Sequence, residues 1–368
     1  MSCEPQGIWG GREHWERIRR MAREKRVPLF GGMELTNRCN LRCVHCYINT
    51  APLREASRPE MGVERIHRLV DEMAEAGCLF FTLTGGEPLL HPKFEEIYRH
   101  IKARGIETYV YTNGTMVGPE QVRLFRELPP FAIQFSLYGA TAETYDAATG
   151  TEGWFGRCME GLRMLVDARL KVSLALPVSA LSRQEIGAMR QMARALGIPA
   201  KTNVNLHETA DGDPGPCRLR LEPDEAVALE AEDGMTAEEW RARADRKADE
   251  GRDPGLVLEC TAGFSAFHVK ADGRMGPCAR VRAEACWGDL NRAAFGEIWN
   301  GPVRKATEIR KPENSSCIGC RVRKYCQYCG ACCISEGGSS LEAPTDTYVC
   351  QIAQAKSRWM AKYGAKNG

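Results

Sequence analysis

Six short apolar runs alternate with helical patterns along the first two thirds of the chain. The runs predict strands at residues 32–36, 79–84, 108–112, 132–137, 171–176 and 201–206. Apolar residues three and four positions apart predict helices between them, among them 63–76, 94–103, 155–168 and 184–196. Because strands that alternate with helices join through right-handed crossovers into a parallel sheet, we predict an α/β fold with a partial (β/α)6 barrel of the TIM type.

Chemistry-bearing residues follow several of these predicted strands, and in barrels of this kind the active site lies at the carboxyl ends of the strands. The first such segment holds Cys39, Cys43 and Cys46, four and three residues apart. Three thiolates leave one iron of a four-iron cluster without a protein ligand, and an open metal position lets a cofactor bind directly. A zinc site is the alternative, and His45 is the local candidate for its fourth ligand.

The cysteine triad and segment 84–88, Thr-Gly-Gly-Glu-Pro, which ends the second predicted strand, together resemble the radical S-adenosylmethionine (SAM) superfamily. The resemblance implies a [4Fe-4S] cluster on the triad, whose open iron binds SAM. It implies a one-electron cleavage of SAM to methionine and a 5'-deoxyadenosyl radical, with the Glu87 carboxylate binding the SAM ammonium group. The residues that match the family's SAM contacts are His45, Gly85, Gly86, Glu87, Asn113, Ser136 and Leu176.

A second group of cysteines occupies the last third of the chain, and its order and spacing resemble the extension called SPASM. This extension carries two auxiliary [4Fe-4S] clusters in many radical SAM enzymes. The resemblance implies that one cluster is held by Cys317, Cys320, Cys326 and Cys350, and the other by Cys260, Cys278 and Cys329. The expected cofactors are therefore SAM and three [4Fe-4S] clusters, and the expected fold is the barrel followed by a small cysteine-rich SPASM domain.

The spacing departs from the SPASM pattern at one point. Two residues rather than three separate Cys326 from Cys329, so Cys332 and Cys333 are alternative ligands. The fourth ligand of the second cluster is Cys286, Cys332 or Cys333, or one of its irons has no protein ligand. One or two zinc knuckles are the alternative to auxiliary clusters.

Composition limits the cellular setting and the partners. The 368 residues include 17 cysteines, and the chain begins without the basic start and apolar core of a signal peptide. We therefore expect a cytoplasmic protein whose cysteines bind metal rather than form disulfides. No apolar run is long enough to span a membrane. Because 50 basic residues nearly balance 48 acidic ones, the net charge of +2 predicts no nucleic-acid partner.

The chain divides into five predicted parts. A basic amphipathic helix near the amino terminus is expected to pack against the barrel. A charge-rich, helix-forming stretch separates the barrel from the cysteine-rich region. The parts are an N-terminal helical extension (1–30), the barrel (31–215), a charged helical linker (216–256), the SPASM domain (257–352) and a C-terminal tail (353–368).

Radical SAM enzymes with this extension mainly modify peptides. The resemblance therefore implies a peptide maturase that abstracts hydrogen from a ribosomally made precursor and forms a thioether or carbon–carbon crosslink. The expected partners are the precursor peptide and a low-potential electron donor such as ferredoxin or flavodoxin. Because only about thirty residues precede the first predicted strand, recognition of a leader peptide, if it occurs, is expected to need a separate protein or a different surface of this one.

Three alternatives remain open. One is an enzyme of the same type that acts on a small molecule, such as a tetrapyrrole or a sugar. Another is a sulfatase maturase, which is disfavoured because such enzymes carry Asp directly after the second cysteine of the extension, where this chain has Ala279 after Cys278. The third is a nonenzymatic iron–sulfur electron carrier, against which the open triad and the glycine pair both argue.

Overall fold

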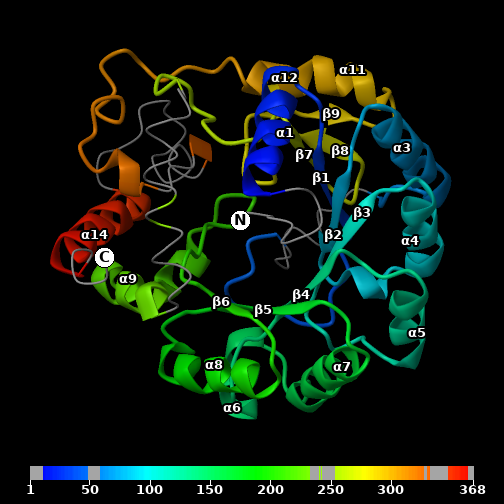
Figure 1. Ribbon diagram of the computed structural model, residues 1–368, viewed down its shortest axis with the longest axis vertical. Helices are drawn as coiled ribbons and strands as arrows, with labels where there is room; N and C mark the ends of the chain where they lie inside the picture. Colours follow the sequence, from blue (N-terminus) through cyan, green and yellow to red (C-terminus); the bar gives the residue numbers. More distant parts are fainter. Residues whose placement is uncertain are drawn as a thin grey trace.

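A partial barrel of six parallel strands forms the body of the molecule in the computed structural model, which describes residues 11–48, 59–232, 240, 242, 253–326, 330–331 and 347–363 (Figure 1). The strands are β1 (Phe30–Thr36), β2 (Phe80–Gly85), β3 (Glu107–Thr112), β4 (Ala132–Ser136), β5 (Val172–Pro177) and β6 (Ala200–Asn203). All six predicted strands are confirmed, and no strand end differs from its prediction by more than three residues.

Helices cover the outer side of this curved sheet (Figure 1). They are α3 (Val63–Glu75), α4 (Phe94–Ala103), α5 (Pro119–Glu127), α6 (Ala142–Thr149), α7 (Phe155–Asp167) and α8 (Ile186–Ala195). The four helices predicted by residue range are confirmed, and α5 and α6 are further helices between the strands. Gly77, Gly105 and Gly197 follow α3, α4 and α8 with φ angles of 93°, 73° and 66°, the left-handed conformation that favours glycine.

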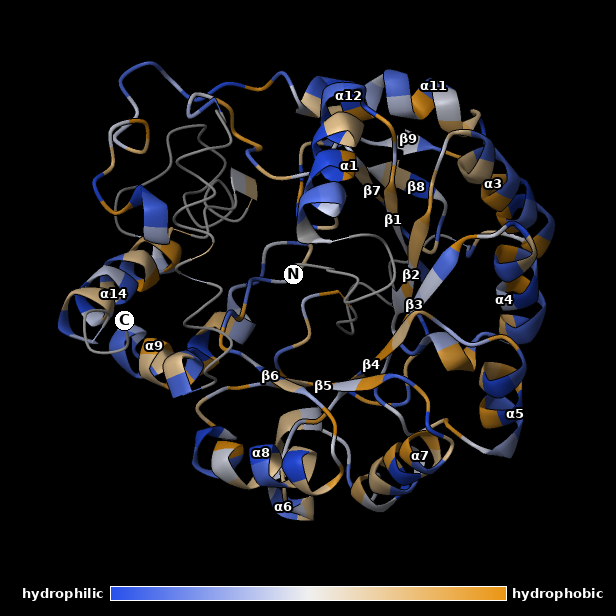
Figure 2. Ribbon diagram, in the orientation of Figure 1, coloured by the Kyte–Doolittle hydropathy of each residue, from blue (hydrophilic) through white to orange (hydrophobic). Residues whose placement is uncertain are grey.

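The sheet has two faces with different surroundings. Phe81, Leu83 and Phe135 are fully buried against the helices and belong to the main hydrophobic core, and Figure 2 shows hydrophobic residues along the strands. On the opposite side, which we call the inner face, every second residue of β4 and β5 is only partly buried. The strand register places Thr82 opposite Gly32 on this inner face.

Helix α1 (Arg12–Glu24) closes the end of the barrel where the strands begin. Trp15 on this helix is buried, and its ring lies 5.4 Å from that of Phe80 and 6.1 Å from that of Phe30. Tyr109 belongs to the same cluster. The predicted packing of the N-terminal helix against the barrel is confirmed, and the opposite end of the inner face, where the strands finish, is left for the site.

Three strands from the cysteine-rich region continue the sheet beyond β1. β7 (Ala266–Val269) pairs with β1 in parallel, and β8 (Arg274–Gly276) and β9 (Gly288–Asp289) follow in antiparallel pairs. Two short helices come next, α11 (Phe295–Asn300) and α12 (Pro302–Ala306). The apolar pattern does not predict these strands, because two to four residues are too few to show a period. The barrel and the cysteine-rich region therefore share one sheet.

The charged segment and the end of the chain pack on each other as α9 (Pro223–Glu232) and α14 (Tyr348–Tyr363) (Figure 1). The Nζ atom of Lys356 lies 2.8 Å from the Glu230 carboxylate, and both side chains are almost fully buried. The predicted boundary at residue 352 therefore falls inside α14, and residues 353–363 belong to a packed helix. Within the described ranges, no helix combines the length and the apolarity that a membrane crossing requires.

Candidate active site

The cysteine triad lies in the loop that follows β1, with all three thiols partly buried. Burial raises the pKa of the Cys43 thiol, and the Cys46 and Cys39 thiolates, which act on it electrostatically, raise it further. The side-chain amide of Asn113 reaches the Cys39 sulfur at 3.9 Å. Hydrogen bonds to thiolate sulfurs are among the features that tune iron–sulfur clusters, so this setting fits a cluster.

The triad supplies three thiolates, a type of ligand that both an iron–sulfur cluster and a zinc ion accept. In a cuboidal cluster each thiolate binds a different iron, and three thiolates leave the fourth iron without a protein ligand. When bound, such a cluster supplies the electron that cleaves SAM.

The glycine pair supports the cysteine loop. Gly85 has a φ angle of 124°, and a Cβ on Gly86 would overlap the Arg38 carbonyl oxygen. The Gly86 N–H donates to the Thr36 carbonyl and the Glu87 N–H donates to the Arg38 carbonyl, both at 2.8 Å. The two glycines are therefore needed because the end of β2 packs directly on the backbone of the triad loop, which the sequence alone does not show.

Glu87 does not offer its carboxylate to a ligand in this structure. The side chain is fully buried, and its oxygens accept hydrogen bonds from the Leu89 N–H (3.1 Å), the Thr112 hydroxyl (2.8 Å) and the Asn113 N–H (2.8 Å). Burial raises the pKa of Glu87 to about 7. In this structure Glu87 ties the ends of β2 and β3 together beside the triad. Its contact with the SAM ammonium group stays a prediction.

Two of the residues predicted to contact SAM, His45 and Ser136, lie against Tyr138. The ring of His45 lies 5.2 Å from the ring of Tyr138, and burial lowers the pKa of His45 to about 4, which keeps it neutral. Ser136 and Cys43 both hydrogen-bond the Tyr138 side chain. His45 and Ser136 thus both lie against Tyr138. The sequence prediction missed Tyr138, although it follows the fourth strand in the same segment as Ser136.

Leu176 is not available to a ligand. Its side chain is fully buried in the main core, on the helix-facing side of β5. The partly buried positions of this strand, which belong to the inner face, are Ser173, Ala175 and Pro177. In this structure the period of two along the strand turns Leu176 toward the core, and its contact with the adenine group stays a prediction.

One predicted set of auxiliary ligands converges in the structure. Burial raises the pKa of the Cys317 thiol, and the thiolates of Cys350 and Cys320 also raise it. Cys350 lies near the start of α14 and returns to the loop that holds the other two. Cys326 follows in the same loop and is partly buried. This arrangement fits a shared cluster.

The second predicted set is described only in part. Cys260 is exposed ahead of β7, and Cys278 is partly buried just after β8. Cys286 is buried in the apolar cluster against which Cys278 packs, so it stays a candidate fourth ligand. Cys329, Cys332 and Cys333 lie outside the described residues.

A contact between Arg280 and Tyr47 joins the two cysteine systems. The guanidinium carbon lies 5.2 Å from the centre of the Tyr47 ring. Tyr47 directly follows Cys46 of the triad, and Arg280 comes two residues after Cys278. Burial raises the pKa of Tyr47 to about 12, so its hydroxyl stays protonated at neutral pH. The loop that follows β8 is thus held against the triad loop.

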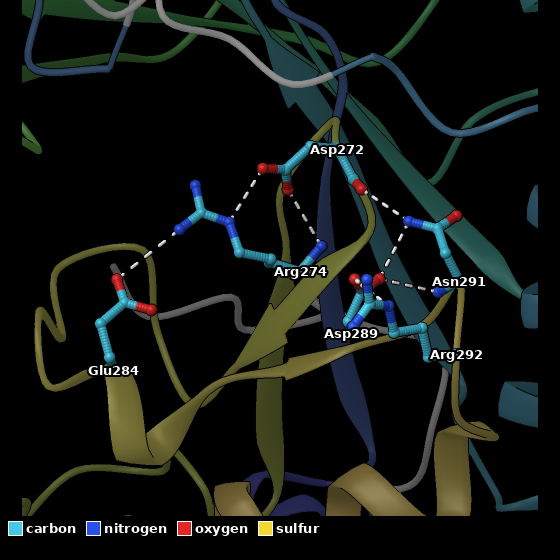
Figure 3. Close-up of polar contacts among 6 residues, drawn as sticks. All are labelled: Asp272, Arg274, Glu284, Asp289, Asn291 and Arg292. Carbon is cyan, nitrogen blue, oxygen red and sulfur yellow. Dashed lines mark hydrogen bonds and ion pairs between the residues drawn. The ribbon is translucent and has the colours of Figure 1, made fainter.

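A polar network fixes the turn between β7 and β8, as Figure 3 shows. The Asp272 carboxylate accepts hydrogen bonds from the Arg274 backbone N–H (3.0 Å) and guanidinium (2.8 Å). The Asn291 amide donates to the Asp272 carbonyl oxygen at 2.9 Å. Gly273 has a φ angle of 87°, and a Cβ there would meet the Asn291 side chain at 2.6 Å. These contacts hold the turn in one conformation and so fix the position of β8, the strand that precedes Cys278.

The inner face also carries an acid–base pair that the sequence prediction missed. The Nε2 atom of His268 on β7 lies 2.9 Å from the Glu34 carboxylate on β1, with side-chain exposures of 15% and 9%. His268 stands opposite Gly32, where a Cβ would come within 3.3 Å of the imidazole. An imidazole beside a carboxylate can accept a proton. The available signal was a carboxylate inside an otherwise apolar strand.

Comparisons with known proteins agree with this geometry. A family model described as the radical SAM superfamily matches residues 33–193, and one described as an iron-sulfur cluster-binding domain, SPASM, matches residues 260–333. The antilisterial bacteriocin subtilosin biosynthesis protein AlbA of Bacillus subtilis is 26% identical, over 83% of this chain and 67% of that protein. The AdoMet-dependent heme synthase of Methanosarcina barkeri is 28% identical, over 86% of this chain and 95% of that protein.

Solved structures share the fold. Native anSMEcpe with bound AdoMet aligns with a TM-score of 0.70 at 15% identity, over 90% of this chain and 97% of that one. Streptococcus suis SuiB bound to precursor peptide SuiA aligns with a TM-score of 0.67 at 15% identity, over 95% and 84%. The triad lies inside the first matched region, and the second contains most of the auxiliary cysteines. The chain is a radical SAM enzyme with a SPASM domain.

Proposed function

We propose that this enzyme modifies a ribosomally made peptide, abstracting a hydrogen atom from one residue and joining that residue to another by a thioether or carbon–carbon bond. The observation that carries the proposal is the polarity of the inner face, to which strands of the barrel and β7 both contribute. Its partly buried polar residues include Thr82, Thr84, Gln134, Ser136, Ser173 and His268.

A surface of hydroxyl, amide and imidazole groups suits a peptide, whose backbone needs hydrogen-bond partners at every residue. A flat apolar macrocycle would instead call for a mostly apolar pocket. SuiB, which shares the fold, binds a precursor peptide. This similarity supports a peptide substrate for the present chain.

The chemistry balances with the groups that the site brings together. SAM, when bound at the triad, would supply a radical that removes a hydrogen atom from the peptide and is released as 5'-deoxyadenosine. Formation of the new bond then releases one proton and one electron. The pair of His268 and Glu34 stands on the inner face as a proton acceptor. We propose an auxiliary cluster as the electron acceptor, and a low-potential ferredoxin or flavodoxin as the donor for SAM cleavage.

A tetrapyrrole is the second candidate substrate, and one observation favours it. The chain covers 95% of the heme synthase of Methanosarcina barkeri but 67% of the peptide-pathway protein AlbA. The match in length is therefore better with the tetrapyrrole enzyme, although the polarity of the inner face favours the peptide.

One experiment separates the two candidates. The anaerobically reconstituted enzyme is given SAM and dithionite with either peptides encoded beside its gene or iron coproporphyrin III. Peptide modification predicts 5'-deoxyadenosine together with a peptide product lighter by two hydrogen atoms, detected by mass spectrometry. Loss of carbon dioxide from the porphyrin, with no change in any peptide, would overturn the proposal. The variant with Ala at Cys39, Cys43 and Cys46 serves as the control that makes no radical.

A further inference from the structure

A buried group of three charges lies among the auxiliary cysteines. The Glu259 carboxylate is 2.7 Å from the Lys311 Nζ atom and 2.9 Å from the Arg323 guanidinium. The side chains of Lys311 and Glu259 are 1% and 6% exposed. Charges that are buried in this way are screened only weakly by water and salt. They act on their surroundings over longer distances than surface charges do.

Two members of this group are next to cysteines of different ligand sets. Glu259 directly precedes Cys260. Arg323 lies between Cys320 and Cys326, where its N–H donates to the Cys320 carbonyl at 3.2 Å and its carbonyl accepts from the Cys326 N–H at 3.0 Å. The ion pair of Glu259 and Arg323 therefore connects the backbone of one ligand set with that of the other.

The third member, Lys311, adds a second positive charge. Its Nζ atom also donates to the Pro254 carbonyl at 2.7 Å, which holds the ammonium group in place. The same ammonium group acts electrostatically on the Cys317 thiol. The group therefore brings two cations and one carboxylate close to the backbone of both ligand sets.

We propose that Glu259, Lys311 and Arg323 together set the reduction potential of the auxiliary clusters. A [4Fe-4S] cluster gains one negative charge when it is reduced by one electron. Its potential depends on nearby charge and hydrogen bonds as well as on its ligands. Each nearby buried positive charge stabilises the reduced form and raises the potential, and each negative charge lowers it. This role concerns the clusters alone and holds whichever substrate the enzyme takes.

The test is a redox titration of the reconstituted full-length holoenzyme with dithionite, without substrate, followed by electron paramagnetic resonance. Arg323→Gln removes a positive charge and is expected to lower the reduced-to-oxidised ratio of the auxiliary clusters at a fixed potential by about threefold to tenfold. A tenfold change equals about 59 mV for a one-electron couple. Glu259→Gln removes a negative charge and is expected to shift the ratio the opposite way. The SAM-binding cluster serves as an internal reference that stays unchanged.

Opposite shifts distinguish an electrostatic role from a structural one, since mere loosening of the domain would move both variants the same way. Arg310→Gln is the matched control, because Arg310 pairs with Asp253 at 2.7 Å in the same region but is 61% exposed. It is expected to leave the potentials unchanged. Arg323→Lys keeps the charge and is expected to keep the parent potential. Shifts of the same sign with full iron content would overturn the proposal.

If Glu259→Gln fails to bind iron, the two substitutions of Arg323 still decide the test. The Arg323 side chain is 23% exposed, so replacing it does not leave a fully buried cavity. Equal potentials in Arg323→Gln and Arg323→Lys would then overturn the proposal. Because no substrate is present, either result leaves the proposed peptide modification untouched.

Discussion

His268 and Glu34 join two parts of the chain that are more than two hundred residues apart, through a contact of 2.9 Å between the imidazole Nε2 atom and the carboxylate. β7 pairs with β1 in parallel along the same seam. The contact therefore fixes the first strand of the cysteine-rich region on the barrel, within the inner face that we propose binds the substrate.

Removing the imidazole leaves the buried Glu34 carboxylate without this contact. A hydrogen bond to a charged group contributes about 1.5 to 3 kcal/mol, so His268→Leu is expected to lower the free energy of unfolding by about that amount. Urea denaturation measures the change. His14→Leu, at an exposed position of α1, is the control and should stay within about 0.5 kcal/mol of the parent. Equal stabilities of the two variants would show that the seam does not depend on His268.

Glu87 gives the fold a dependence on pH. Burial raises the pKa of this carboxyl group from 4.5 to about 7. The stability that its protonated form contributes is complete below pH 4.5 and is lost as the pH rises through about 7, in total about 3 kcal/mol. We expect Glu87→Gln to remove this loss when unfolding is compared at pH 5 and pH 8. The exposed Glu152→Gln should keep the parent pH dependence, and the prediction fails if Glu87→Gln also keeps it.

Gly86 is expected to be indispensable for the triad loop. A Cβ at this position would overlap the Arg38 carbonyl oxygen, which is backbone and cannot rotate away. Gly86→Ala should therefore lose about four irons per chain and the cleavage of SAM, while the auxiliary clusters remain. Gly187→Ala, where the added Cβ meets nothing within 4 Å, is the control. Full iron content with normal SAM cleavage in Gly86→Ala would contradict the structure of this loop.

The metal content follows from the three expected clusters. Anaerobic reconstitution should give about twelve irons per chain, and Ala at Cys39, Cys43 and Cys46 together should leave about eight and abolish formation of 5'-deoxyadenosine. Iron and zinc analysis by mass spectrometry measures both quantities. Stoichiometric zinc with little iron in protein purified without oxygen would refute the cluster assignments.

A buried ion pair between Lys356 and Glu230 lies where α9 packs on α14. The stability that is lost when one partner is replaced should be regained when the other is replaced as well. Lys356→Met leaves the Glu230 carboxylate buried without its cation, which costs about 3 to 5 kcal/mol of unfolding free energy. Replacing both residues by Met removes the two charges together and should restore most of that stability. Urea denaturation of the parent and of both variants tests this, and a double variant no more stable than Lys356→Met would refute it.

Much of the fold was determined by local sequence. The six parallel strands and four of their helices follow from periods of two and 3.6 residues, which depend only on neighbours along the chain. The cysteine triad is also local, because its three ligands occupy a single loop of eight residues. A site built from one segment can be recognised in the segment itself.

The tertiary structure decided how distant segments meet. The sequence does not indicate that β7 pairs with β1, since a strand of four residues has no readable period, and so it does not bring His268 to Glu34. The sequence also does not indicate that three hydrogen-bond donors of the protein surround the Glu87 carboxylate in the folded chain. Pairing partners and the burial of charged groups depend on residues far away along the chain, and these contacts form only when the whole chain folds.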